Sequence, residues 1–304
     1  AGFRMNALIS LHTNAAWGKL AVEFVQAKDD PTTLQTFVNT ILGQGWRSAG
    51  DELAEDELMA RAEPFGLAAV PAEVLAVTVG VDVQHDRLEV TYLGWTEGGV
   101  ALVMGHRVIW GQYDAEETWV ELDGLIGARF PHALGGKIGV DACAIDAGDG
   151  VSMHHVTAFA TPRTRRKVLA IKGAPGNRPM IERAGSTTKT GARLWIIGVD
   201  TVKLQLFGRL AQAGSFRFSA DLPPVWFEQL ASERSVVRYT RGQPTRNFVR
   251  IPGRRAEALD CVVYAFAARA LLNLDYDQRR ADLSTEAAPA PKRAPVLVSS
   301  WMQR

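Results

Sequence analysis

Alternation of apolar residues with small or polar residues predicts that the middle of the chain is built on β-strands. In residues 74–83, VLAVTVGVDV, valines alternate with Ala76, Thr78, Gly80 and Asp82, which is the period-two pattern of a strand. Asp82 therefore shares a strand face with small residues, and we expect them to leave a shallow cavity beside its carboxylate. The segments RLEVTYLGW and VALVMGHRVIWG predict two further strands of an antiparallel meander.

After the meander, helical and strand patterns alternate. Asp114 and Glu117 have capping-box spacing, which predicts a helix beginning at this point. Further strands are predicted in KIGVDACAID, KVLAIKGA and RLWIIGV, and a mostly apolar helix from residue 255 to about 273 is expected to pack inside the molecule. The order predicts an α/β fold in which a mixed sheet, an antiparallel meander plus parallel strands, is flanked by helices.

Three aspartates on these buried elements are the main candidates for chemistry: Asp82, Asp146 and Asp260. Carboxylates gathered from separate buried elements usually hold divalent cations. Each has a structural alternative. Asp82 can be a solvated strand end, Asp146 competes with Asp141 and Asp149 nearby, and Asp260 can be an ordinary acid in the first turn of a helix, where it interacts with the helix dipole.

The residue types favour a pair of Mg²⁺ or Mn²⁺ ions, because hard cations prefer oxygen ligands and two of them suit phosphodiester hydrolysis. His154 and His155 adjoin each other, but no cysteine pair has the spacing of a zinc site. Glu257 precedes Asp260 by three residues on the same helix face and is a possible auxiliary acid, as is Asp149. Lys172 is a possible phosphate contact, although a lysine at a strand end is more often simply exposed.

Charge is distributed unevenly along the chain. The net charge of +1 does not by itself indicate a nucleic-acid partner. Residues 234–255, however, contain seven arginines and no acid, and a second basic cluster, RTRRK, lies at 163–167. Arginine makes bidentate contacts to phosphate, so these segments suit a DNA backbone. For RTRRK a solvated surface is an equal alternative. The candidate DNA-binding residues are Arg165, Arg166, Arg246, Arg250, Arg254 and Arg255.

Composition limits the setting of the protein. The chain has 304 residues, of which 47% are hydrophobic and 22% charged, and no apolar run is long enough to span a bilayer. The opening AGFRMNALIS lacks the pattern of a signal peptide. Cys143 and Cys261 both lie in apolar stretches, so we expect buried thiols in a reducing, cytoplasmic compartment and no membrane partner.

Four segments, IGVDACAIDAG, AIKGA, GARLWIIGVDTVK and RRAEALDCVVYAFAA, resemble in order and spacing the nuclease region of the large terminase subunit of tailed phages, in the branch typified by phage lambda. The resemblance implies an RNase H-like endonuclease that cuts concatemeric double-stranded DNA in the host bacterial cytoplasm. It also implies that two Mg²⁺ or Mn²⁺ ions are held by Asp82, Asp146 and Asp260. The extra acid Asp149 leaves the ligand assignment in the second loop less certain.

The same resemblance divides the chain into three parts. Residues 1–72 match the segment that joins an upstream ATPase domain to the nuclease and end in an acidic linker, residues 73–275 match the nuclease, and residues 276–304 are expected to be a disordered tail. No GxxxxGK[ST] motif occurs, so the chain is not expected to hydrolyse ATP. The implied partners are double-stranded DNA, the terminase small subunit, the upstream ATPase domain, and the portal or procapsid through the tail.

Two other functions stay open on sequence alone. An RNase H-like resolvase or transposase gathers acids on the same kind of sheet, although the AIKGA and EALDC segments argue against it. A non-catalytic DNA-binding or motor-docking module could carry the same acids for structural reasons. Metal-dependent cleavage would distinguish a nuclease from such a module. Analysis of the products from linear and from branched DNA would distinguish the terminase nuclease from a resolvase.

Overall fold

The computed structural model describes residues 5–28, 31–44, 54–148, 150–188, 191–240 and 243–285. The chain forms two compact units, Ala1–Asp51 and Glu52–Arg304. The first unit contains two short 3₁₀ helices, η1 (Ala7–Ile9) and η2 (Thr13–Ala15), and two α-helices, α1 (Trp17–Ala27) and α2 (Pro31–Thr40).

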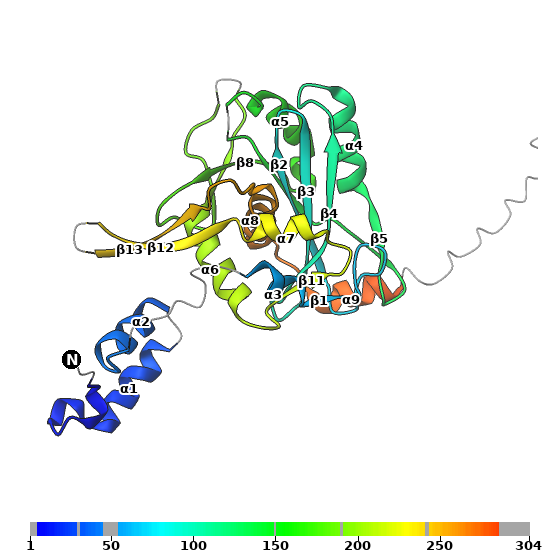
Figure 1. Ribbon diagram of the computed structural model, residues 1–304. Coiled ribbons are helices and arrows are strands. Elements are labelled where there is room, and N and C mark those ends of the chain that lie inside the picture. Colours follow the sequence, from blue (N-terminus) through cyan, green and yellow to red (C-terminus); the bar gives the residue numbers. More distant parts are fainter. Residues whose placement is uncertain are drawn as a thin grey trace, which may run out of the picture. The chain divides into compact units, whose positions relative to one another are not determined.

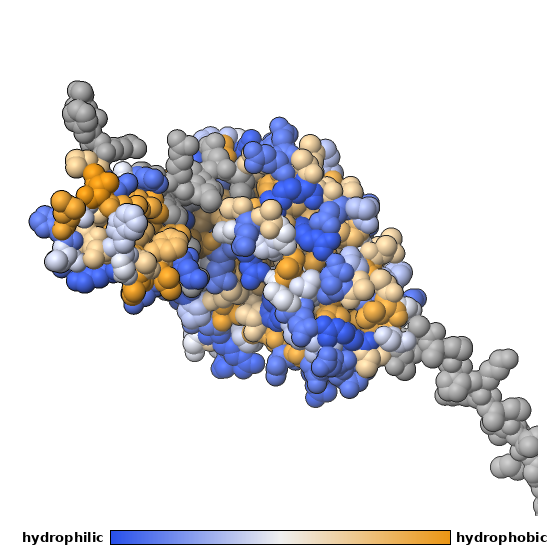
Figure 2. All heavy atoms as spheres, turned by 90° about the horizontal axis from the view of Figure 1, so that it is seen from below, coloured by the Kyte–Doolittle hydropathy of each residue, from blue (hydrophilic) through white to orange (hydrophobic). Residues whose placement is uncertain are grey.

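Helices α1 and α2 pack through few apolar contacts. Phe24 and Phe37 bring their ring centroids to 5.5 Å, and Phe37 is buried. Other apolar side chains of this unit, including Met5, Leu11 and Trp17, are largely exposed. Figure 2 shows hydrophobic residues, in orange, on the surface of this unit. The first unit thus encloses only a small core of its own.

The second unit is built on a mixed sheet that has nine strands among the described residues, in the order β1-β11-β4-β3-β2-β7-β8-β10-β9 (Figure 1). Strands β2, β3 and β4 pair antiparallel, and β2, β7, β8 and β10 pair parallel. This is the predicted antiparallel meander plus parallel strands, so the RNase H-like mixed sheet is confirmed. The bounds are β1 Ala62–Glu63, β2 Ala76–Val83, β3 Arg87–Trp95, β4 Ala101–Trp110, β7 Ala142–Asp146, β8 Val168–Ala174, β9 Ile181–Arg183, β10 Trp195–Gly198 and β11 Phe216–Ser219.

Helices cover both faces of the sheet, so its central strands are buried on both sides. One apolar core joins the sheet to α6 (Val199–Ala211), α7 (Pro224–Leu230) and α8 (Glu257–Ala268). The other joins it to α4 (Glu116–Gly127) and α5 (Met153–Ala160), which continues into the 3₁₀ helix η3 (Thr161–Arg166). The valines of β2 belong to the α4–α5 core, whereas Ala76 belongs to the α8 core.

The small residues on one face of β2 accommodate helix α8. A Cβ atom at Gly80 would lie 1.9 Å from the carbonyl oxygen of Cys261 and 2.7 Å from the backbone nitrogen of Ala265. Thr78, two residues earlier, donates a hydrogen bond from Oγ1 to the carbonyl of Ala265 at 2.8 Å. The shallow cavity expected from these small residues is therefore occupied at Gly80, where the missing side chain makes room for the backbone of α8.

Two smaller ribbons complete the unit. Strands β12 (Glu233–Thr240) and β13 (Gln243–Arg250) form an antiparallel hairpin that extends from the body of this unit (Figure 1). Strands β5 (Arg129–Pro131) and β6 (Lys137–Gly139) pair with each other. The hairpin carries much of the arginine-rich sequence to the end of helix α8 at which Glu257 lies.

Two local predictions were wrong. The segment KIGVDACAID is not one strand but splits into β6 and β7, and Asp141 lies in the break, where it accepts a hydrogen bond from the backbone nitrogen of Val77 at 2.9 Å and pairs with Arg279. Helix α4 begins at Glu116 without a side-chain cap, so the capping box at Asp114 does not form. Asp141 thus has a structural role.

The folded unit extends past both predicted boundaries. Strand β1 pairs with β11, and helix α3 (Glu55–Met59) buries Leu58, so part of the predicted joining segment belongs to this unit. Helix α9 (Tyr276–Thr285) lies in the predicted tail, yet its Leu283 is only 3% exposed. A short 3₁₀ helix, η4 (Arg269–Leu271), precedes it. Residues from 286 onward lie outside the described residues.

In the part of the chain that the structure describes, each helix is too short or too polar to cross a membrane.

Replacing Gly80 with alanine tests the contact between β2 and α8. Because both close atoms belong to backbone, we expect Gly80→Ala to lower the free energy of unfolding by at least about 2 kcal/mol, within the usual range for overpacking. Gly124→Ala is the matched control: its Cβ meets nothing within 4 Å, and in helix α4 it is expected to stabilise by up to about 1 kcal/mol. Urea unfolding measures both, and equal stability of the two variants would contradict the packing.

Candidate functional site

The three predicted aspartates come from three elements that meet at one end of the sheet. Asp146 is the last residue of β7, and Asp82 lies one residue before the end of β2. The parallel register pairs Val81 with Ile145, so the two aspartates follow on adjacent strands. Asp260 is in the first turn of α8, whose backbone rests on Gly80 two residues from Asp82. The structure thus brings together the three acids singled out from sequence.

Asp82 is the most buried of the three aspartates, with 5% of its surface exposed. Burial raises its pKa to about 8, against the opposing effect of a hydrogen bond from Gln84. The negative charges of three neighbouring carboxylates contribute to the same rise: Asp260, Asp146 and Glu257. The acids are therefore close enough to repel one another, and a cation in their midst would relieve that repulsion.

Asp82 and Asp146 each accept a local hydrogen bond. Oδ2 of Asp82 accepts from Nε2 of Gln84 at 2.5 Å, and Oδ1 of Asp146 accepts from the backbone nitrogen of Gly148 at 3.0 Å. Among the described residues, no group of three or more His, Cys, Asp or Glu side chains is already arranged to hold a metal ion. The acids thus form a cluster without the geometry of a complete coordination sphere.

Asp260 lies between a buried and an exposed cation. Its Oδ1 is 3.9 Å from Nζ of Lys203, which belongs to α6, and its Oδ2 is 3.4 Å from a guanidinium nitrogen of Arg250 on β13. Lys203 in turn donates to Oε2 of Glu233 at 2.7 Å. Burial raises the pKa of Asp260, and the two cations oppose that rise.

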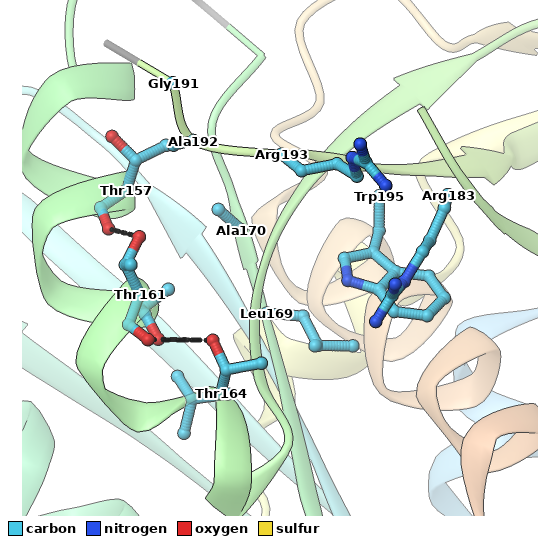
Figure 3. A pocket seen from close by; sticks show the side chains of 12 residues that line it. Thr157, Thr161, Thr164, Leu169, Ala170, Arg183, Gly191, Ala192, Arg193 and Trp195 are labelled. Atoms are coloured by element: carbon cyan, nitrogen blue, oxygen red, sulfur yellow. Dashed lines mark hydrogen bonds between the residues drawn. The ribbon is translucent and has the colours of Figure 1, made fainter. Parts of the chain in front are cut away.

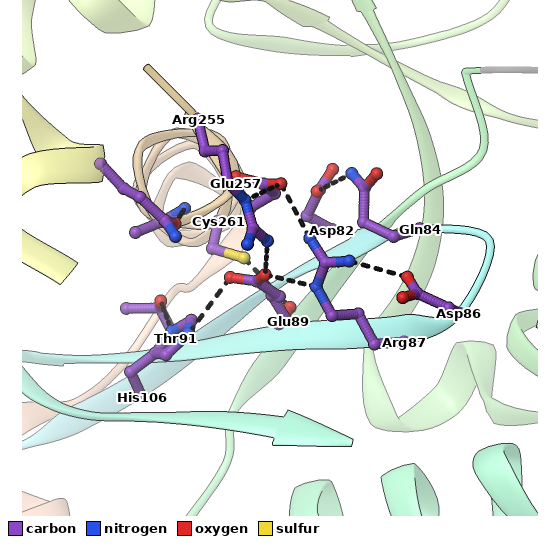
Figure 4. A network of polar contacts seen from close by, with 12 residues as sticks. Asp82, Gln84, Asp86, Arg87, Glu89, Thr91, His106, Arg255, Glu257 and Cys261 are labelled. Atoms are coloured by element: carbon purple, nitrogen blue, oxygen red, sulfur yellow. Dashed lines mark hydrogen bonds and ion pairs between the residues drawn. The ribbon is translucent and has the colours of Figure 1, made fainter. Parts of the chain in front are cut away.

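A network of ion pairs, centred on the buried Arg87 and Glu89, adjoins Asp82 (Figure 4). Arg87 binds Oε1 of Glu89 and Oε1 of Glu257, both at 2.8 Å, and so links strand β3 to helix α8. Arg255 contacts the same two oxygens, at 3.0 and 2.9 Å respectively. The second oxygen of Glu257, Oε2, is buried and has no hydrogen-bond partner. Glu257 therefore keeps one carboxylate oxygen free beside the cluster.

Glu89 differs from the aspartates because its charge is compensated. Burial would raise its pKa, but interactions with His106 and Arg87 outweigh this effect, and the pKa lies below its usual value. Oε2 of Glu89 is 3.4 Å from Nε2 of His106, whose Nδ1 is 2.9 Å from the hydroxyl of Thr91. Glu89 is thus a stable anion that holds the arginines of the network.

The donor set fits a hard divalent cation. All the converging groups present oxygen atoms, one of them is an unpartnered buried oxygen of Glu257, and the neighbouring carboxylates add to the rise that burial causes in the pKa of Asp82. Asp82, Asp146 and Asp260 are the residues that could hold such an ion, and Glu257 could assist.

The candidate arginines divide between two places. Arg250 contacts Asp260, Arg255 contacts Glu257, and Arg254 contacts the carbonyl of Ala231, so all three lie around the start of α8. Arg246 is half-buried on β13. By contrast, the candidates Arg165 and Arg166 lie in η3, which follows α5 on the other side of the sheet, where Arg166 pairs with Asp123 of α4 at 2.9 Å. Only the first group adjoins the acids.

Of the two remaining sequence candidates, Lys172 does not join the cluster. Strand alternation places Lys172 on the α5 face of β8, where it lines a cavity of about 550 Å³ with His154 and Thr157. Asp149 lies outside the described residues. A second cavity, of about 320 Å³, is lined by the threonines of α5 and η3 and by Trp195, over which Arg183 stacks (Figure 3). None of the three aspartates lines either cavity.

Sequence reasoning missed Lys203, Arg87, Glu89 and Glu233. For Lys203 a signal existed, because it occupies the buried stripe of α6 together with Leu206, Phe207 and Leu210. A charge at such a position requires a buried partner. The pairing of Glu89 with Arg87 gives no such signal, since both occur in a strand that the pattern could only describe as amphipathic.

A mixed sheet with carboxylates gathered at the ends of its central strands defines the class of RNase H-like domains with an acidic centre. The chain belongs to the family of terminase large subunit endonuclease domains: the family described as "Terminase large subunit gpA, endonuclease domain" matches residues 1–282. The resemblance noted in the sequence is thereby confirmed.

Individual relatives agree with the family. The large terminase subunit of Enterobacteria phage P21 is 33% identical over 267 residues, which is 83% of this chain and 41% of that protein. The large terminase subunit of Escherichia phage lambda is 29% identical over 281 residues, 88% of this chain and 43% of that protein. This chain therefore spans less than half the length of these relatives. Among solved structures, the human cytomegalovirus terminase nuclease domain aligns with a TM-score of 0.35 and 11% identity over 68% of this chain and 87% of that chain.

The raised pKa of Asp82 predicts a pH-dependent loss of stability in metal-free protein. The folded state keeps the proton of Asp82 up to about pH 8, whereas the unfolded chain releases it near pH 4, so stability falls between these values as pH rises. Asp82→Asn removes this loss. We expect the variant to gain at least about 1.4 kcal/mol over the parent at pH 8, the equivalent of one pH unit of pKa difference.

Urea unfolding in EDTA at pH 5 and pH 8 measures this gain, with Asp277→Asn, whose side chain is 96% exposed, as the control. A difference between Asp82→Asn and parent that is the same at both pH values would contradict the burial of an uncompensated acid.

Proposed function

We propose that this chain is a metal-dependent DNA endonuclease that hydrolyses phosphodiester bonds of concatemeric double-stranded phage DNA. The observation that carries the proposal is the meeting of Asp82, Asp146 and Asp260 from three separate elements in a buried, mutually repelling cluster. Stability alone does not favour such a cluster, since carboxylates brought close together repel one another when they are ionised. Membership of the endonuclease-domain family supports the same function.

Divalent ions bound by the three aspartates would activate a water molecule and neutralise charge on the phosphate and on the leaving oxygen. The protein's part is to hold the acids in place. Strand pairing fixes Asp82 beside Asp146, and the contact of α8 with Gly80 fixes Asp260. Cation binding would also drive the proton off Asp82, whose pKa burial has raised.

The arginines around the start of α8 supply a surface for the DNA backbone. Arg250 and Arg255 each have 54% of their side-chain surface exposed and lie beside Asp260 and Glu257 respectively. A duplex held there would place a phosphate close to the acids. Arg246 on the same hairpin and Arg254 extend this surface, whereas Arg165 and Arg166 on the α5 side are not needed for it.

The proposal extends to the setting of the whole protein. In a terminase large subunit this domain would act in the host bacterial cytoplasm, with an ATPase domain in the same protein, the small subunit, and the portal or procapsid as partners.

Substitution of the acids tests the proposed chemistry. Asp82→Asn, Asp146→Asn and Asp260→Asn keep the size of each side chain but remove its charge, so we expect plasmid cleavage in Mn²⁺ or Mg²⁺ to fall at least about 100-fold, with DNA binding retained. Asp277→Asn, on the exposed face of α9, should cleave like the parent, and EDTA should stop all cleavage.

Cleavage that survives in one of the three variants would remove that residue from the site. DNA binding by the parent without any cleavage would favour the non-catalytic module instead, and preferential cutting of branched over linear DNA would favour a resolvase.

The arginine surface has its own test. Arg250→Gln should weaken duplex binding and reduce the slope of log affinity against log salt concentration by about 0.9, the value for one lost phosphate contact. Arg165→Gln, an exposed arginine beside α5, is the matched control and should change neither quantity. Fluorescence anisotropy at several salt concentrations measures both, and equal effects of the two variants would contradict the placement of DNA over α8.

A further inference from the structure

Lys203 is a buried lysine shared by two carboxylates. Its side chain is 10% exposed, and its Nζ lies 2.7 Å from Oε2 of Glu233 and 3.9 Å from Oδ1 of Asp260. Glu233 is also buried and begins strand β12. The lysine therefore connects three elements, α6, β12 and α8, at the point where α8 carries a proposed metal ligand.

The two cationic side chains that face Asp260 differ in how freely they can move. Arg250, which faces Oδ2, is 54% exposed and can move to solvent or to a phosphate. Lys203, which faces Oδ1, is 10% exposed and is held by its ion pair with Glu233 at 2.7 Å, so it has much less freedom to move away. Oδ2 can become available to a cation while Lys203 still restrains Oδ1.

We propose that Lys203, anchored by Glu233, is a positioning residue that fixes the orientation of the Asp260 carboxylate for metal binding. The inference rests on the proposed function, because it assumes that Asp260 binds a divalent ion. An ammonium group cannot itself bind a cation, so Lys203 acts only through Asp260. Partners that orient a ligand in this way typically contribute about 10- to 100-fold to metal affinity or activity.

A single Lys203→Met variant is a poor test, since it leaves Glu233 buried without a partner and can unfold the protein. The double variant Lys203→Met/Glu233→Met removes both charges and keeps similar volumes, so the fold is retained while Asp260 loses its restraint. Lys137→Met, an exposed lysine on β6, is the control for loss of a positive charge.

The measurement is the Kd for Mn²⁺ in the absence of DNA, by isothermal titration calorimetry, with thermal unfolding of each variant recorded alongside. We expect the double variant to unfold near the temperature of the parent and to bind Mn²⁺ about 10- to 100-fold more weakly. Lys137→Met should match the parent. Glu233→Gln, which keeps Lys203 but loosens its anchor, should show a smaller loss of a few fold.

Mn²⁺ binding by the double variant that equals or exceeds that of the parent would overturn the inference, because a lysine that merely repels cations gives tighter binding when removed. If the double variant does not fold, unchanged Mn²⁺ affinity in Glu233→Gln overturns it equally. If Asp82→Asn loses Mn²⁺ binding but the double variant keeps the affinity of the parent, the role of Lys203 is wrong and the proposed metal site stands. A parent that binds no Mn²⁺ overturns the proposed function as well.

Discussion

The close contact of helix α8 with strand β2 at Gly80 is the constraint on which the site depends. Only a residue without a side chain allows the backbone of Cys261 to approach the strand this closely. The contact places Asp260, one residue before Cys261, beside Asp82, two residues after Gly80. A helix held farther from the sheet by even one methyl group would separate the carboxylates, so the geometry of the acids is set by backbone packing.

Around this contact, burial and charge oppose each other. The sheet and α8 enclose Asp82 in an apolar setting that favours its neutral form, yet three further acids lie close by. The protein compensates part of this charge with cations from within: Lys203 for Asp260, and Arg87 for Glu89 and Glu257. Asp82 itself accepts a hydrogen bond from the neutral amide of Gln84. A divalent cation would neutralise the negative charge that these internal cations leave uncompensated.

The sequence predicted the elements better than their contacts. Period-two alternation identified β2 and the face that Asp82 occupies, and the apolar circumference of α8 indicated its burial. Alternation cannot show, however, whether a face of small residues borders a cavity or a helix, and the cavity expected from the small residues of β2 is occupied by α8 at Gly80. Nor does it reveal long-range ion pairs: Arg87 and Glu257 are far apart in sequence and meet only in the folded chain. The lysine in the apolar stripe of α6 was a usable signal.

Diffraction from crystals soaked in Mn²⁺, with the anomalous signal recorded, tests the central claim most directly. The account predicts two peaks about 3.5 to 4 Å apart between Asp82, Asp146 and Asp260. The unpartnered oxygen of Glu257 should turn toward one of these peaks. Crystals that bind Mn²⁺ elsewhere, or show no peak between these carboxylates at saturating Mn²⁺, would contradict a metal centre and leave the cluster as an electrostatic feature of the fold.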